Sequence, residues 1–127
     1  MNTRIAVSIE ESPNGEIRVA DHFGRCTKFL VYEINEDKKV TNEKSYQNPL
    51  QSNHGGACEL PNYIKEMGAN VVIAGGMGSK AIALFNQLGI QVITAPGLQL
   101  EEALFGYMNG ELKDYDECSG HHGNYNN

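Results

Sequence analysis

The chain has 127 residues, of which 40% are hydrophobic and 20% are charged. This length suits one domain with one core, and this balance is far from the polar composition of disordered chains. The net charge is −6 and the basic residues are scattered singly, so the sequence lacks the basic stripe that nucleic-acid binding requires.

The N-terminal apolar run is short and is followed at once by two acids, unlike a signal peptide. No segment approaches the roughly 20 apolar residues that span a bilayer. We therefore predict a cytoplasmic protein with no membrane association. Three cysteines, an odd number, then indicate free thiols or metal ligands rather than a disulfide framework.

The first half of the chain predicts an antiparallel arrangement of strands. Residues 4–9 form a short β-branched run that predicts a buried strand, and residues 16–19 add a short strand after a turn. Residues 28–34 predict the next strand. After a polar turn, residues 39–46 alternate enough to predict its hairpin partner.

The second half switches to the helical period. Apolar residues recur at helical spacing up to Met67, and Gly68 follows, so we predict a helix that begins no earlier than about Cys58. Residues 70–74 predict a buried strand, which a glycine turn joins to a helix capped by Ser79. Residues 90–95 predict the next strand, and residues 100–108 predict a last helix.

This order predicts an α/β fold, with helices on both faces of a mixed sheet of about five strands. It is the three-layer α/β/α, ribonuclease H-like arrangement. Residues 1–113 form this domain. Residues 114–127 have no core-forming periodicity and predict a mobile acidic tail that bears cysteine and histidine.

Soft-metal ligands gather in three places in the sequence. Two loops share the spacing His-x3-Cys, and the tail holds a third group. Thiolate and imidazole select zinc, copper or iron-sulfur species over calcium and magnesium. The candidate metal ligands are His22, Cys26, His54, Cys58, Cys118, His121 and His122.

We expect the two loops to approach one another at one end of the sheet and to form a single site. The alternative is that Cys26 and Cys58 are small buried hydrophobes and that His22 only closes a turn. Likewise, the tail ligands could belong to nothing more than a hydrophilic chain end.

The turn after the strand at residues 70–74 contains Gly75, Gly76 and Gly78. Its letters match the dinucleotide-binding fingerprint, but the next strand runs into Pro96 and Gly97 instead of ending in an acidic residue. Two interpretations stay open. The glycines serve either a tight turn or an anion seat that uses free N–H groups at the helix start.

The sequence does not favour an enzyme. The strands at residues 4–9 and 70–74 carry no acids that would hold the two metals of a nuclease. Cys58 and His54 could form a thiolate-imidazole pair, but nothing evident orients the imidazole. A cysteine-dependent enzyme therefore stays a minor alternative.

Four blocks of sequence, residues 4–7, 21–26, 68–78 and 88–92, together resemble the dinitrogenase iron-molybdenum cofactor biosynthesis family. The resemblance covers about residues 3–110. It implies a ribonuclease H-like domain of the kind that stands alone or forms part of nitrogenase cofactor carriers. One branch of the family carries a mixed molybdenum-copper sulfide cluster.

The resemblance implies that the protein binds and carries or delivers a metal-sulfur cluster, of iron-molybdenum or molybdenum-copper type, and meets a cluster-assembly or acceptor protein. It implies a role for His22 above all, with Gly75, Gly76 and Gly78 facing the cluster. Zinc or another single metal is the alternative cargo. The tail is similar to the endings of some stand-alone members, and a stand-alone domain need not take part in nitrogen fixation. The competing hypothesis is an adaptor without metal.

Overall fold

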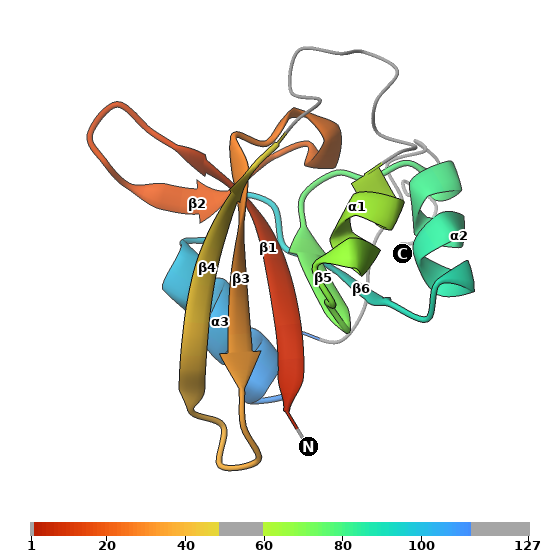
Figure 1. Ribbon diagram of the computed structural model, residues 1–127. Helices are drawn as coiled ribbons and strands as arrows, with labels where there is room; N and C mark the ends of the chain where they lie inside the picture. Colours follow the sequence, from red (N-terminus) through yellow and green to blue (C-terminus); the bar gives the residue numbers. More distant parts are fainter. Residues whose placement is uncertain (1, 49–59, 113–127) are drawn as a thin grey trace.

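The computed structural model describes residues 2–48 and 60–112, and its centre is a mixed sheet (Figure 1). The strands are β1 (Thr3–Glu11), β2 (Ile17–Val19), β3 (Lys28–Ile34), β4 (Val40–Gln47), β5 (Val71–Ala74) and β6 (Gln91–Thr94). Their order is β4-β3-β1-β5-β6, and β2 pairs with the end of β1. The pairs that β1 makes with β2 and β3, and the β3–β4 pair, are antiparallel. The β1–β5 and β5–β6 pairs are parallel.

The central strand β1 is apolar because both of its faces are covered. Ile5, Val7 and Ile9 belong to one core cluster, whereas Ala6 belongs to the other. Successive side chains of a strand point to opposite faces, so β1 contributes to two cores at once. A continuous apolar run is the pattern expected of such a strand.

Three helices in the described part of the chain cover the sheet. The helices α1 (Leu60–Glu66) and α2 (Ser79–Gln87) pack on one face, and α3 (Leu100–Met108) packs on the other. Figure 1 shows α3 on the far side of the β3–β4 hairpin from α1 and α2. The predicted α/β/α arrangement is confirmed. None of these three helices combines the length and apolar character needed to span a bilayer.

The sheet has six strands against the predicted number of about five, and the short strand predicted at residues 16–19 is β2, which pairs with β1 over three residues. One local prediction was wrong, because Ser79 is the first residue of α2 rather than its N-cap. Gly78 holds the N-cap position and has no side chain with which to cap the helix. The glycine that follows α2 was predicted correctly, since Gly89 has a left-handed φ of 77°.

Candidate functional site

The candidate site is built where the loop after β2 crosses the end of β5. His22 forms a parallel β-bridge with Gly76. The Phe23 N–H donates to the Gly76 carbonyl at 2.9 Å, and the Gly76 N–H donates to the Asp21 carbonyl. Three consecutive residues of one loop are thereby fixed against the turn that leads into α2.

Gly75 allows this close approach of two backbones. A Cβ atom at this position would lie 1.8 Å from the Ala20 carbonyl oxygen and 2.5 Å from the Asp21 carbonyl oxygen. No real side chain fits such a gap, so the position requires glycine. Gly75 therefore sets how near His22 lies to the start of α2.

A second loop holds the same segment from its other side. The Val19 N–H donates to the Leu98 carbonyl at 2.8 Å, and the Gly97 N–H donates to the Val19 carbonyl at 3.1 Å. The Arg18 Nη1 atom donates to the Gly97 carbonyl at 2.7 Å. The chain that precedes His22 is thus held between the β5–α2 turn and the β6–α3 loop.

The exposed side of the site holds an imidazole and the start of a helix. The side chain of His22 is exposed, and a Cβ atom added at Gly78 would meet nothing within 4 Å. The first N–H groups of an α-helix have no partner within the helix, and Gly78 supplies no side-chain cap for α2. This end of α2 therefore presents N–H groups and a partial positive charge, both of which suit an anionic ligand.

Cys26 lies in the same loop, but its side chain faces inward. It is 0% exposed and belongs to the core cluster under α1 and α2. The Asn48 Nδ2 atom donates to the Cys26 carbonyl at 2.9 Å and lies 3.6 Å from its Sγ atom. Burial raises the pKa of the Cys26 thiol to about 12. A thiol held neutral in this way is a poor nucleophile and a poor metal ligand unless the loop rearranges.

The other candidate ligands are not in the described part of the chain. His54 and Cys58 lie outside the described residues, as do Cys118, His121 and His122. The predicted approach of the two His-x3-Cys loops and the predicted tail therefore stay predictions. Within residues 2–48 and 60–112, no three His, Cys, Asp or Glu side chains converge on a point that could hold a metal ion.

Two residues of this region were not among the sequence-based candidates. Arg25 is exposed in the short 3-10 helix at Phe23–Arg25, so it places a cation in the same loop as His22. Asn48 is buried and fixes the loop at Cys26. The position of Arg25 inside the His-x3-Cys segment was visible in the sequence, whereas nothing in the sequence pointed to Asn48.

Comparisons with known proteins agree with this fold. The chain is 32% identical to the protein MJ0580 of Methanocaldococcus jannaschii, over 89% of this chain and 92% of that one. The structure of PH0822 has a TM-score of 0.73 and 32% identity, covering 88% of this chain and 96% of that chain. The apo form of the orange protein from Desulfovibrio gigas has a TM-score of 0.68 and 26% identity, covering 87% of this chain and 90% of that chain.

These similarities show that the chain shares the fold of a group of small α/β domains. A family model described as "dinitrogenase iron-molybdenum cofactor" matches residues 3–110, which is most of the chain. The chain belongs to this family, as the resemblance of its sequence blocks implied.

Proposed function

We propose that this protein binds a metal-sulfur cluster, of iron-molybdenum or molybdenum-copper type, and carries or delivers it during metallocofactor assembly. The observation that carries the proposal is the contact between the His22 loop and the β5–α2 turn. The backbone of the exposed residue His22 is bridged to the turn that begins α2, a helix start without a side-chain cap, in a chain whose family concerns the iron-molybdenum cofactor.

The chemistry of these groups suits an anionic sulfide cluster as cargo. The imidazole of His22 supplies a nitrogen ligand to a soft metal. The Gly76 N–H is bonded to the Asp21 carbonyl, so Gly75, Gly76 and Gly78 serve the cluster by shaping the turn that leads into α2. The first N–H groups of α2 are offered to sulfide or oxo atoms, and Arg25 adds a cation in the same loop as His22. Cys26, His54, Cys58, Cys118, His121 and His122 are proposed as further ligands, and Cys26 would first have to leave its buried position.

A carrier fits these residues better than an enzyme does. The thiol of Cys26 is buried and neutral, so it does not supply the activated nucleophile that covalent catalysis needs. We propose that the protein acts by binding and release, with a cluster-assembly or acceptor protein as its partner. A single metal such as zinc is the alternative cargo.

The proposal is tested by purifying the protein without oxygen and reconstituting it with iron and sulfide, with molybdate, copper and sulfide, or with zinc. Elemental analysis and the absorption spectrum give the metal and its stoichiometry. We expect stoichiometric metal in the wild type and loss of most of it in His22→Ala. Asn86→Ala, an exposed change near the far end of α2, is the matched control and should retain the metal.

A protein that never holds a stoichiometric metal under these conditions would contradict the proposal and favour the adaptor hypothesis. A His22→Ala variant that holds metal as tightly as the wild type would instead show that the metal site does not lie at the β5–α2 turn.

A further inference from the structure

The strand β4 forms one edge of the sheet and pairs only with β3 among the described residues. Seven of its eight residues are exposed. An edge strand presents a row of unpaired N–H and C=O groups that an extended segment of another chain can join. This edge is long enough to accept such a segment.

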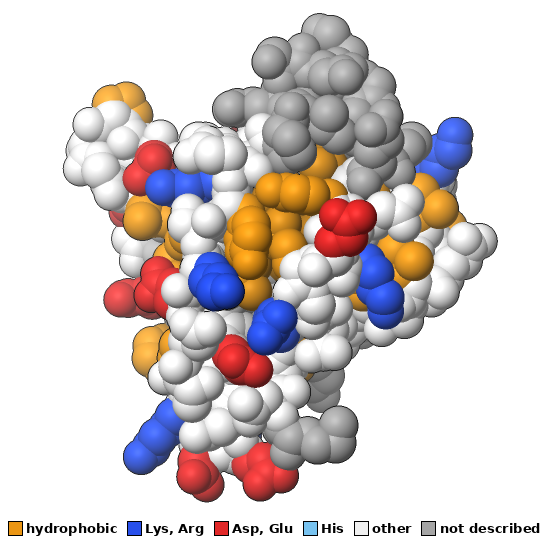
Figure 2. Space-filling view, in the orientation of Figure 1, with side chains coloured by type: hydrophobic (Ala, Val, Ile, Leu, Met, Phe, Trp, Pro, Cys, Tyr) orange, Lys and Arg blue, Asp and Glu red, His pale blue; other side chains and the backbone are white. Residues whose placement is uncertain are grey.

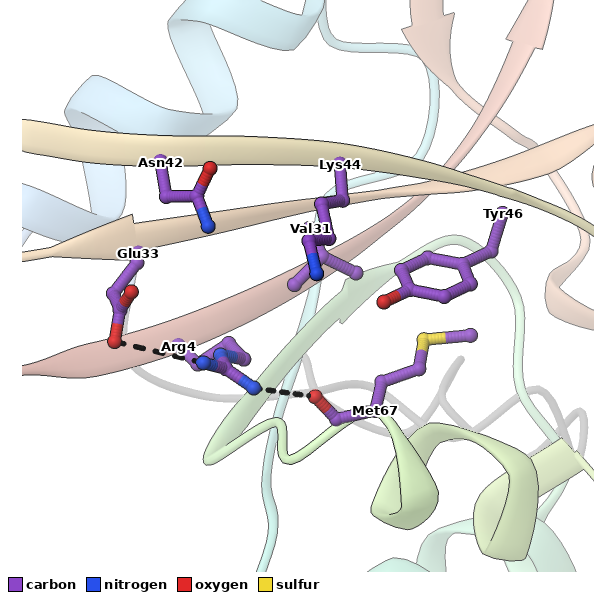
Figure 3. Close-up of a pocket in the computed structure, with 7 residues that line it drawn as sticks. All are labelled: Arg4, Val31, Glu33, Asn42, Lys44, Tyr46 and Met67. Carbon is purple, nitrogen blue, oxygen red and sulfur yellow. Dashed lines mark hydrogen bonds and ion pairs between the residues drawn. The ribbon is translucent and has the colours of Figure 1, made fainter.

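One row of β4 side chains borders a small hollow, shown in Figure 3. Asn42, Lys44 and Tyr46 alternate along the strand, and they pair with Glu33, Val31 and Phe29 of β3. The hollow has a volume of about 20 Å³, room for one water-sized group. Figure 2 shows an apolar patch on this face, bordered by both basic and acidic side chains.

The polar groups around the hollow differ in whether they have hydrogen-bond or ion-pair partners among the described residues. The Arg4 Nη1 atom donates to the Met67 carbonyl at 2.8 Å, and its Nη2 atom lies 3.6 Å from Glu33 Oε2. Arg4 and Glu33 thus neutralise each other. Within the described residues, the Lys44 ammonium and the Tyr46 hydroxyl have no hydrogen-bond or ion-pair partner. The mouth of the hollow therefore has an unneutralised positive charge in a chain whose net charge is −6.

A second copy of this chain fits the edge badly. When two copies of β4 pair antiparallel about a two-fold axis, the two residues opposite each other must point to the same face of the sheet. Two symmetric registers pair seven residues of β4, over 40–46 or 41–47. The first sets Glu43 opposite Glu43, and the second sets Lys44 opposite Lys44. Like charges directly opposite each other destabilise a strand pair, so the sequence of β4 disfavours self-pairing.

We propose that the edge of β4 pairs with an extended segment of a partner protein that places an acidic side chain opposite Lys44. The carboxylate accepts hydrogen bonds from the Lys44 ammonium and the Tyr46 hydroxyl at the mouth of the hollow. Next to it on the same face, an apolar side chain of the partner packs beside Tyr46 and Met67. This inference does not depend on whether the protein carries a cluster.

The test uses the full chain and a fluorescent threonine-rich peptide that has a central glutamate and a valine two positions to each side. Anisotropy titration compares it with the same peptide bearing a central lysine. We expect the glutamate peptide to bind about threefold tighter or more, because opposite charges face each other across the strands. Lys44→Glu should reverse the preference, and Lys44→Ala should abolish it.

Two controls separate strand pairing from general attraction. Lys80→Glu makes the same charge change on α2 and should leave the preference unchanged. A glutamate peptide with prolines on both sides of the glutamate cannot pair as a strand and should not bind. Thermal unfolding checks that each variant is folded.

The proposal is overturned if no peptide binds, if Lys44→Glu does not change the preference, or if the proline peptide binds as well as the glutamate peptide. Sedimentation velocity tests whether a second copy of this chain occupies the edge instead of a partner protein. A homodimer that Lys44→Glu strengthens or weakens would show that a second copy covers this edge, and would also overturn the proposal.

Discussion

Gly75 lies where two backbones come closest in the candidate site. We predict that Gly75→Ala destabilises the fold by about 3 kcal/mol or more, because its methyl group would overlap the Ala20 carbonyl oxygen and force the loops apart. Urea unfolding measures the loss. Gly78→Ala is the matched control. Its Cβ atom has open space around it and should cost about 1 kcal/mol or less, through the weaker N-cap preference of alanine.

Cys26 couples the stability of the fold to pH. Burial raises the pKa of its thiol from 9.0 to about 12 in the folded protein. The unfolded thiol ionises first as the pH rises. The stability that the neutral thiol contributes is therefore complete below about pH 9 and is lost as the pH rises toward 12.

We predict that stability falls by about 1.4 kcal/mol for each pH unit above 9 on account of this one group. Urea unfolding at about pH 8 and about pH 10 measures the change. Burial also raises the pKa of the Tyr32 hydroxyl to about 12 and raises the pKa of Tyr63, so measurements above pH 10 would mix the thiol with these tyrosines. Cys26→Ala should unfold more easily at both pH values but show a smaller difference between them. An equal difference in both proteins would mean that the thiol is not buried in solution.

At the residue scale, the sequence identified which groups could bind a soft metal but not which way they point. The spacing His-x3-Cys placed His22 and Cys26 in one loop. In the structure, His22 is exposed and Cys26 is 0% exposed. Cys26 belongs to a core cluster that includes Leu60 and Phe85, which are distant in the sequence, so no local pattern encodes the direction of its side chain. The need for glycine at position 75 has the same origin, because it comes from a contact with residue 20.

The β3–β4 hairpin contains the one non-glycine residue of the described chain that has a left-handed backbone. Lys38 has a φ of 63°, and its N–H donates to the Asn35 carbonyl at 2.9 Å. We predict that Lys38→Gly stabilises the protein by about 0.5–1 kcal/mol, because glycine adopts this conformation without a Cβ penalty. Thermal unfolding gives the change. Lys39→Gly is the matched control and should destabilise, since Lys39 has an ordinary φ.

At the scale of elements, periodicity predicted the strands and helices well wherever one face is buried. The strand at residues 28–34 was predicted with its observed limits, and α3 matched as well. The short strand β2 was predicted too, at residues 16–19 against the observed Ile17–Val19. The miss was the N-cap of α2, which is a glycine where serine is the stronger signal. The place of β4 at the end of the strand order could not be predicted, because strand order depends on long-range pairing.

At the scale of the whole molecule, the switch from antiparallel strands to alternating strands and helices determined the three layers. Right-handed crossovers then placed helices on both faces of the sheet. The sequence pattern could not predict the contact of the loop after β2 with the β5–α2 turn. This contact joins residues 54 positions apart through the His22–Gly76 bridge. That contact combines the histidine and the glycine turn, which the sequence showed separately, into one candidate site.

The last prediction concerns the C-terminal segment, which lies outside the described residues. Deleting residues 115–127 should leave the fold intact, because the family match ends at residue 110 and no core periodicity crosses Asp114. The free energy of unfolding should barely change. Metal retention should fall, because the deletion removes Cys118, His121 and His122, which bind metal only when deprotonated.

The loss of metal caused by the deletion should resemble the loss of metal from the intact chain when the pH is lowered through the histidine range near 6.5. Metal content after dialysis, measured for both proteins across that range, is the readout. Replacing Cys118, His121 and His122 with serine and asparagine in the full-length chain is the matched control, because it removes the ligands but keeps the length. If the shortened protein holds metal as tightly as the full chain at every pH, the tail contributes no ligands, and the site depends on the loops of His22 and Cys58.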